Sequence, residues 1–275
     1  MVTAVNHPTV AGAPSVGGEG ERFVDAAPRN WELFYQHVAR YRHARRFVAD
    51  RIVLDLACGS GYGAALLART ARRVLAADVS RSALQYGAVH HGAANVQRLQ
   101  SDGCRLALRA ASIDVIVSFE TIEHVPDMPQ LLREFHRVLK PDGLLLVSTP
   151  NRPLYGVYNK GRRNPFHCVE LEEEEFRSLL GHVFAVEAMA GQRHFARKDI
   201  PLIAPFASGP VPTGPDGLVR RAARAALRTW LPQEWRAHHW LDMQIWANKC
   251  SIGDVPPAHG VYMIARARKT VGASR

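Results

Sequence analysis

Short apolar runs alternate along most of the chain with stretches in which apolar residues recur at helical spacing. The apolar runs predict strands at 52–57, 73–78, 96–100, 113–119, 143–149, 183–190 and 260–267. The helical spacing predicts helices at 62–70, 81–90, 128–139 and 172–181. Runs such as Val115–Val117 and Leu144–Val147 contain no polar position, so helices are expected on both faces of the sheet. Strand–helix alternation predicts a parallel, doubly wound α/β fold.

The two ends and one internal segment fall outside this alternation. Residues 1–19 are mostly small and apolar without periodicity, which predicts a disordered tail. Residues 20–50 carry aromatic residues at helical spacing and predict a helical cap ahead of a core at 51–193. Residues 194–258 hold four of the five tryptophans and a basic helix, and they precede a final strand at 259–268. This insertion is expected to form a lid over the site or a homodimer contact, and the sequence leaves both open.

A glycine-rich turn follows the first strand, in the pattern Asp55-x-x-x-Gly59-x-Gly61. Open α/β sheets use such a turn to hold a nucleoside ligand against the backbone. A Cβ at either glycine would keep the ligand away from the turn. Asp55 would repel the pyrophosphate of a dinucleotide, and it would suit a ligand that carries an ammonium group. Asp78 ends the next strand about 20 residues further on, where it is placed to accept hydrogen bonds from ribose hydroxyls.

On these residues the chain resembles the class I S-adenosylmethionine-dependent methyltransferases. Ser101-Asp102-Gly103 is similar to the segment in which an Asp meets the adenine amino group, and Leu139–Val147 is similar to the family's "LKPGG" turn and fifth strand. Asp142 stands where glycine is usual, a change that a turn tolerates. The resemblance implies S-adenosylmethionine as cofactor and a Rossmann-like sheet of seven strands, the last antiparallel. It also implies cofactor contacts from Asp55, Ala57, Gly59, Gly61, Asp78, Val79, Asp102, Gly103, Phe119 and Glu120.

Candidate catalytic residues follow the fourth strand, at the edge where doubly wound folds bind their ligands. An alcohol acceptor must lose a proton as its oxygen is methylated, so a base or a metal ion is needed. His124 is the first candidate base, and Glu123 lies beside it. His167 is the second, either as a base or as an acceptor-binding residue. Each histidine has a purely structural alternative, such as shaping its loop or bonding a buried carbonyl.

Magnesium is a further possibility at the same edge of the sheet. Some sugar O-methyltransferases use this ion to hold adjacent hydroxyls and to lower the pKa of one of them. Glu120, Glu123 and His124 are the candidate ligands.

Three segments resemble a bacterial subgroup associated with glycan and polysaccharide synthesis. They are Gly20-Glu21-Arg22-Phe23, Ser148-Thr149-Pro150-Asn151 and Asn164-Pro165-Phe166-His167. This resemblance implies an O-methyltransferase acting on a sugar, an oligosaccharide or a glycosylated metabolite. Candidate acceptor-binding residues are Arg22, Tyr41, Asn164 and His167. The alternatives are O- or N-methylation of a non-sugar secondary metabolite, nucleic-acid methylation, and a cofactor-binding protein that transfers no methyl group.

Composition narrows these alternatives. The formal net charge is +10, but the basic residues are dispersed, and an Asn/Asp-Pro-Pro-Tyr segment is absent, so nucleic acid is a disfavoured partner. No apolar run reaches the roughly 18 residues of a membrane span, and no secretory signal is visible. The four cysteines are scattered, which favours neither a zinc site nor a disulfide framework and fits the cytoplasm.

Overall fold

The computed structural model describes residues 31–162, 164–192, 252 and 260–270. The predicted disordered tail, Arg22 and, apart from Ile252, the predicted insertion at 194–258 lie outside these residues.

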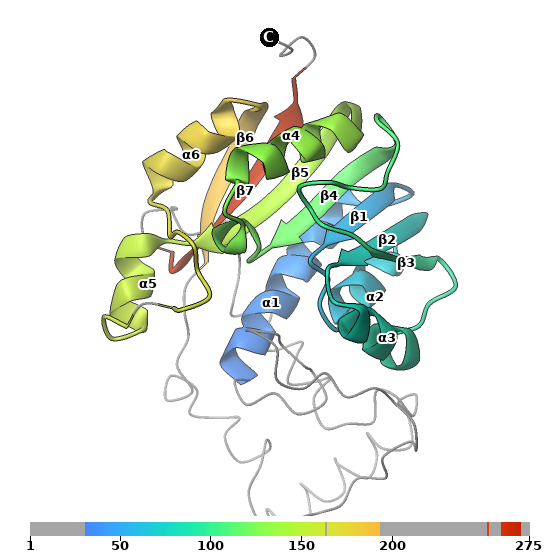
Figure 1. Cartoon of the computed structure of the whole chain (residues 1–275), viewed down its shortest axis with the longest axis horizontal. Helices are drawn as coiled ribbons and strands as arrows, with labels where there is room; N and C mark the ends of the chain where they lie inside the picture. Colours follow the sequence, from blue (N-terminus) through green and yellow to red (C-terminus); the bar gives the residue numbers. More distant parts are fainter. Residues whose placement is uncertain (1–30, 163, 193–251, 253–259, 271–275) are drawn as a thin grey trace, which may run out of the picture.

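A seven-stranded sheet in the order β3-β2-β1-β4-β5-β7-β6 forms the centre of the described fold (Figure 1). The strands are β1 Ile52–Leu56, β2 Arg73–Asp78, β3 Val96–Gln100, β4 Ile113–Phe119, β5 Leu139–Pro150, β6 Phe184–Gln192 and β7 Tyr262–Lys269. The helices are α1 Trp31–Ala44, α2 Tyr62–Ala68, α3 Arg81–His90, α4 Met128–Val138, α5 Arg152–Tyr158 and α6 Glu173–Gly181, with 3-10 turns at Arg45–Phe47 and Ile122–His124. Strand β7 is antiparallel to both of its neighbours. The predicted seven-stranded, doubly wound α/β fold is confirmed.

Each face of the sheet carries its own apolar core because side chains alternate along every strand. Val53 and Val117 point to the face covered by α1, α2 and α3. Leu54 and Ile116 point to the face covered by α4 and α6. Residue 55 therefore shares the face of Val53, beneath α1 and α2.

The predicted strand at 143–149 extends further, over Leu139–Pro150. Its first residue pairs with Ile113, and the register then shifts before Val115 pairs with Leu144. Asp142 lies in this irregular stretch with φ +60°, the left-handed conformation for which glycine is usual at this turn. The short helix α5 had not been predicted from the sequence.

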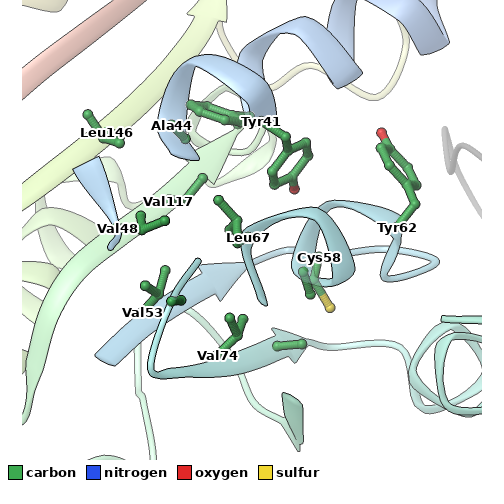
Figure 2. Close-up of a cluster of buried hydrophobic side chains, with 14 of the residues drawn as sticks. Tyr41, Ala44, Val48, Val53, Cys58, Tyr62, Leu67, Val74, Val117 and Leu146 are labelled. Atoms are coloured by element: carbon green, nitrogen blue, oxygen red, sulfur yellow. The ribbon is translucent and has the colours of Figure 1, made fainter. Parts of the chain in front are cut away.

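Tyr41 of α1 packs against the start of α2 and the end of β4. Its ring forms edge contacts with Tyr62 at 5.8 Å and with Phe119 at 5.3 Å between ring centroids. Figure 2 shows this ring reaching from α1 toward the turn that carries Cys58. A Cβ built on Gly63 would lie 2.0 Å from Cζ of Tyr41, so a glycine is needed for α1 to pack this closely.

We expect Gly63→Ala to lower the free energy of unfolding by about 1–3 kcal/mol, because the buried Tyr41 ring must move. Chemical denaturation monitored by circular dichroism measures this change. Gly156→Ala in α5 is the matched control, since nothing lies within 4 Å of the position that its added methyl group would occupy. Equal losses in both variants, or none in either, would contradict the packing role of Gly63.

Candidate functional site

The glycine-rich turn leaves β1 through three residues with positive φ. These are Ala57 at +57°, Gly59 at +54° and Gly61 at +86°. Gly61 is the N-cap of α2, so the turn places the start of this helix next to the end of β1. A Cβ on Gly59 would meet nothing within 4 Å, so the backbone here borders open space. This surface is what a nucleoside ligand needs in order to approach the backbone.

Asp78, the last residue of β2, is hydrogen-bonded to the glycine-rich turn. Its Oδ2 accepts a hydrogen bond from the Gly59 N–H at 2.9 Å, and its Oδ1 accepts one from the Ser80 N–H at 2.8 Å. Each carboxylate oxygen has a second acceptor position, so these bonds do not exhaust Asp78. The ribose contact expected from the sequence remains a prediction, and the structure adds a role in shaping the turn.

Asp55 is completely buried beside Tyr41. The Tyr41 hydroxyl donates to Oδ1 of Asp55 at 3.0 Å, and Oδ2 has no hydrogen-bond partner among the described residues. The pKa of Asp55 is raised to about 8. Burial is the largest cause, the hydrogen bond from Tyr41 acts in the opposite direction, and the nearby Asp78 charge adds to the rise. The unpartnered oxygen of Asp55 would be satisfied by a ligand ammonium group. Acceptor binding by Tyr41 remains a prediction. Its buried position does not support this role, because the Tyr41 hydroxyl is bonded to Asp55.

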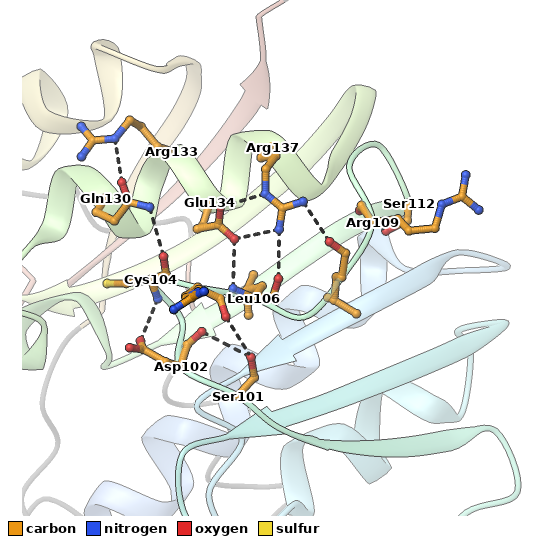
Figure 3. A network of polar contacts seen from close by, with 12 residues as sticks. Ser101, Asp102, Cys104, Leu106, Arg109, Ser112, Gln130, Arg133, Glu134 and Arg137 are labelled. Atoms are coloured by element: carbon orange, nitrogen blue, oxygen red, sulfur yellow. Dashed lines mark hydrogen bonds and ion pairs between the residues drawn. The ribbon is translucent and has the colours of Figure 1, made fainter.

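Asp102 lies on an exposed loop after β3, where its Oδ1 accepts the Cys104 N–H at 2.8 Å. Arg137 and Glu134 of α4 hold this loop in place (Figure 3). Arg137 donates to the carbonyls of Leu106 and Leu108, and Glu134 accepts the Leu106 N–H at 3.0 Å. Asp102 is therefore an exposed carboxylate on an anchored loop, which fits the predicted adenine contact.

The other predicted cofactor residues differ in their exposure. Val79 is 58% exposed next to Asp78 and offers an apolar surface to a flat base. Gly103 is small for a packing reason, since a Cβ would lie 2.8 Å from Leu131 and 2.9 Å from Leu56. Phe119 is buried against Tyr41.

Glu120 follows β4 with φ +52° and turns its carboxylate back toward the sheet. Its Oε1 accepts the Ser148 hydroxyl at 2.8 Å and lies 3.4 Å from Nη1 of Arg40. Arg40 is fully buried, stacks on Tyr262 at 4.2 Å and donates from Nε to Gln192. The Arg40 charge thus offsets the Glu120 charge at the edge where β4 and β5 end.

Glu123 is fully buried in the 3-10 turn after β4. Thr149 donates to its Oε2 at 3.1 Å, and Oε1 has no hydrogen-bond partner within the part of the chain that the structure describes. Burial, reinforced by the nearby Glu120, raises the pKa of Glu123 well above its ordinary value.

His124 and His167 meet edge to face with ring centroids 4.8 Å apart. Nδ1 of His124 lies 2.9 Å from the Phe166 carbonyl oxygen, so this nitrogen is the protonated one and Nε2 carries the lone pair. Nδ1 of His167 donates to Glu170 at 2.9 Å, and Nε2 accepts from the Asn164 amide at 3.0 Å. The Asn164 side chain decides which atom donates: its Oδ1 accepts the Phe166 N–H, so its Nδ2 faces His167 and must be the donor in that bond.

These contacts separate the two candidate bases. Both ring nitrogens of His167 are engaged, whereas Nε2 of His124 has no hydrogen-bond partner among residues 31–162, 164–192, 252 and 260–270. His124 is therefore the better placed proton acceptor.

Glu123, His124 and His167 each place one ligand atom within 4.8 Å of the others. The sequence had indicated Glu120, Glu123 and His124 as magnesium ligands. Glu120 is not part of the observed cluster, because Arg40 and Ser148 engage its carboxylate. His167 takes its place, which changes the donor set from mainly oxygen to two nitrogens and one oxygen.

Two contributing residues received no role in the sequence interpretation. Arg40 pairs with Glu120 although they are far apart in the chain. Glu170 orients His167, and its position three residues later in the same loop is a local signal that could have indicated it.

S-adenosylmethionine fits the cofactor side on three observations. The backbone at Gly59 is open, Asp55 has a buried oxygen without a partner among the described residues, and Val79 and Asp102 are exposed beside the turn. These features suit a nucleoside with an ammonium group. None of the described helices is long and apolar enough to cross a lipid bilayer.

A family described as a methyltransferase domain matches residues 54–147. A Mycobacterium tuberculosis (strain H37Rv) protein named "Probable S-adenosylmethionine-dependent methyltransferase" is 38% identical over 179 residues, 65% of each chain. A Mycolicibacterium smegmatis protein with a similar name is 36% identical over 178 residues, 64% of this chain and 68% of its own. A ubiquinone biosynthesis O-methyltransferase of Xanthomonas oryzae is 36% identical over 115 residues, 41% of this chain and 48% of its own. The match to the M. tuberculosis protein covers just under two thirds of that protein's length.

Solved structures share the fold at low sequence identity. A chain from a complex of the Haloferax volcanii Trm112 methyltransferase activator has a TM-score of 0.58 and 15% identity, over 89% of this chain and 96% of its own. The N-methyltransferase NodS of Bradyrhizobium japonicum, in complex with S-adenosyl-L-homocysteine, has a TM-score of 0.54 and 14% identity, over 88% of this chain and 90% of its own.

Proposed function

Because the chain belongs to the family of S-adenosylmethionine-dependent methyltransferases, we propose that it methylates a hydroxyl of a sugar, an oligosaccharide or a glycosylated metabolite. The observation that carries this proposal is the position of two groups of residues at one edge of the sheet. The glycine-rich turn follows β1, and the Glu123–His124–His167 cluster follows the neighbouring strand β4. A methyl donor on the turn would lie next to an acceptor on the cluster.

The donor side is assigned to residues around the turn. Asp55 would bind the ammonium group, Asp78 the ribose, and Asp102 and Val79 the adenine. When bound, S-adenosylmethionine supplies an activated methyl group: the acceptor oxygen bonds to the methyl carbon as the sulfur–carbon bond breaks, leaving S-adenosylhomocysteine.

The acceptor side is assigned to the cluster. The hydroxyl proton must leave as the new bond forms, since an alcohol is a weak nucleophile at neutral pH. His124 would accept this proton at Nε2. If Nε2 instead holds an ion, the ion would lower the pKa of the hydroxyl and the proton would pass to water. An amine acceptor has a lone pair once deprotonated and depends less on such a group, so the cluster favours oxygen as the methylated atom.

The acceptor class rests on the resemblance of three segments to the glycan-associated subgroup. Two of them lie in the described residues: Ser148–Asn151 ends β5, and Asn164–His167 forms the loop with His167. Asn164 and Arg22 are retained as acceptor-binding candidates. At this edge the described contacts leave Nε2 of His124 open to an acceptor hydroxyl. Glu120, Asn164 and His167 would each have to exchange an existing hydrogen bond to contact the acceptor.

A second candidate is O-methylation of a non-sugar metabolite, such as a phenol. The relative named as a ubiquinone biosynthesis O-methyltransferase favours it, since that name implies a non-sugar acceptor. N-methylation, nucleic-acid methylation and binding without transfer are less favoured. We also propose a cytoplasmic location, with which the free Cys58 and Cys104 agree. A homodimer contact through residues 194–258 is part of the same proposal.

Turnover against matched acceptors tests the assignment. We expect the full chain with S-adenosylmethionine to add one methyl group, detected by mass spectrometry, to members of a panel of mono- and oligosaccharides. Phenols and amines of similar size form the comparison panel. Methylation confined to phenols would favour the second candidate, and methylation confined to amines would contradict the O-transfer proposal.

A further inference from the structure

We propose that Glu123, His124 and His167 bind one divalent transition-metal ion. The site differs from the magnesium site expected at Glu120, Glu123 and His124, both in its ligands and in the metal it suits. Its existence rests on the geometry of the three side chains. Its consequence for catalysis rests on the proposed function.

The distances are close to those of a metal centre. One ligand atom from each residue lies within 4.8 Å of the other two. Around a tetrahedral ion with bonds of about 2.1 Å, ligand atoms lie roughly 3.5 Å apart. Small side-chain rotations would therefore bring the three atoms to bonding distance without a backbone change.

Both histidine rings make the kind of hydrogen bond that metal-binding rings make. A ligating imidazole donates its other N–H to a carbonyl or a carboxylate, which fixes the tautomer and directs the free nitrogen at the metal. His124 makes such a bond from Nδ1 to the Phe166 carbonyl, and His167 makes one from Nδ1 to Glu170. Nε2 is thus the unprotonated nitrogen on both rings.

Glu123 has a buried carboxyl oxygen that a cation would satisfy, and this observation is independent of the histidine contacts. Its side chain is fully buried, and its Oε1 has no hydrogen-bond partner among the residues that the structure describes. Leaving a buried carboxyl oxygen unsatisfied is costly, whereas coordination to a cation satisfies it.

Among the described residues, the hydrogen bond from Asn164 to His167 must be exchanged when the ion binds. The Asn164 amide donates to Nε2 of His167 and would have to withdraw from that lone pair. Asn164 can retain its bond to the Phe166 N–H through Oδ1, so the exchange involves only the amide nitrogen.

The donor set indicates the kind of metal. Two imidazole nitrogens and one carboxylate suit Zn²⁺, Mn²⁺, Fe²⁺ or Co²⁺, whereas Mg²⁺ prefers oxygen ligands. Three protein ligands leave coordination positions open, and an acceptor hydroxyl in one of them would have a lowered pKa. With the ion bound, His124 would serve as a ligand, the ion would lower the pKa of the hydroxyl, and the proton would pass to water.

Metal binding is measured without any methyl transfer. The full chain is stripped with EDTA, dialysed and titrated with CoCl2 and with MnCl2 by calorimetry, and the visible absorption of Co²⁺ is recorded. We expect one equivalent to bind, with an absorption change that reports nitrogen coordination. His124→Ala and Glu123→Gln should each weaken binding at least about 100-fold, and Glu170→Gln about 10-fold.

The exposed His182, which directly follows α6, provides the matched control. His182→Ala should bind Co²⁺ as the unchanged chain does, and circular dichroism confirms that each variant is folded. Absence of a one-equivalent site, or equal binding by folded His124→Ala, would overturn the inference. Methyl transfer that persists in EDTA would overturn its catalytic consequence and leave the proposed function intact. Metal binding without methyl transfer to any acceptor would support the metal site and contradict the proposed function.

Discussion

His124→Ala is expected to lower the turnover number about 100-fold or more while leaving the affinity for S-adenosylhomocysteine unchanged. Nε2 of His124 carries a lone pair at the acceptor side of the site, because Nδ1 donates to the Phe166 carbonyl. Loss of this nitrogen removes either the base that accepts the hydroxyl proton or, if an ion is bound, a ligand of the ion that would lower the pKa of the hydroxyl. Cofactor binding is spared because His124 is not among the predicted cofactor residues, most of which lie at the ends of β1, β2 and β3.

Steady-state kinetics on the best acceptor, together with calorimetry of S-adenosylhomocysteine, measures both quantities. His182→Ala again serves as the control and should retain normal turnover. Near-normal turnover of His124→Ala would exclude His124 from the chemistry. A parallel loss of cofactor affinity would indicate a structural role for the ring.

Asp55→Asn is expected to reduce affinity for S-adenosylhomocysteine about 10- to 100-fold and to remove a pH dependence of stability. The affinity falls because an ammonium–carboxylate hydrogen bond, worth about 1.5–3 kcal/mol, is lost. The amide still accepts the Tyr41 hydroxyl, so the contact between α1 and β1 is kept.

The stability effect follows from the raised pKa of Asp55, about 8 in the folded chain against a reference value of 3.8. Between these values the folded chain holds a proton that the unfolded chain has released. Stability therefore falls as pH rises through this window and levels off above about pH 8. At about 1.4 kcal/mol for each pKa unit, the fall attributable to Asp55 is at most on the order of 6 kcal/mol.

Chemical denaturation of the cofactor-free chain at several pH values between 5 and about 9 measures this slope. The slope should be shallower in Asp55→Asn than in the unchanged chain. Asp142→Asn is the control, because residue 142 is exposed and Asn tolerates its positive φ. An unchanged slope in Asp55→Asn would show that the buried carboxyl does not hold a proton.

The features predicted from the sequence were those set by neighbouring residues. The apolar runs indicated the strands, and Gly59 and Gly61 indicated a turn that only positive φ angles could make. Helix α5 escaped prediction because it is one short segment, Arg152–Tyr158, without an extended apolar period.

The features that escaped prediction depend on contacts distant in the chain. Tyr41 reaches Asp55 only once α1 has packed on the sheet. Arg40 meets Glu120, and His167 meets His124, through the arrangement of β4, β5 and their loops. Glu120 was a candidate metal ligand because it follows the fourth strand together with Glu123 and His124. The folded chain commits Glu120 to Arg40 and Ser148 and brings in His167 instead.

Methyl transfer to a saccharide is tested best by following the methyl group itself. The full chain is incubated with S-adenosylmethionine bearing a deuterated methyl group and with the saccharide panel, and products are fragmented by mass spectrometry. We expect one labelled methyl group on a saccharide oxygen, with an equal amount of S-adenosylhomocysteine. Binding of S-adenosylhomocysteine with no labelled oxygen in any acceptor, or label on nitrogen only, would contradict the proposed function.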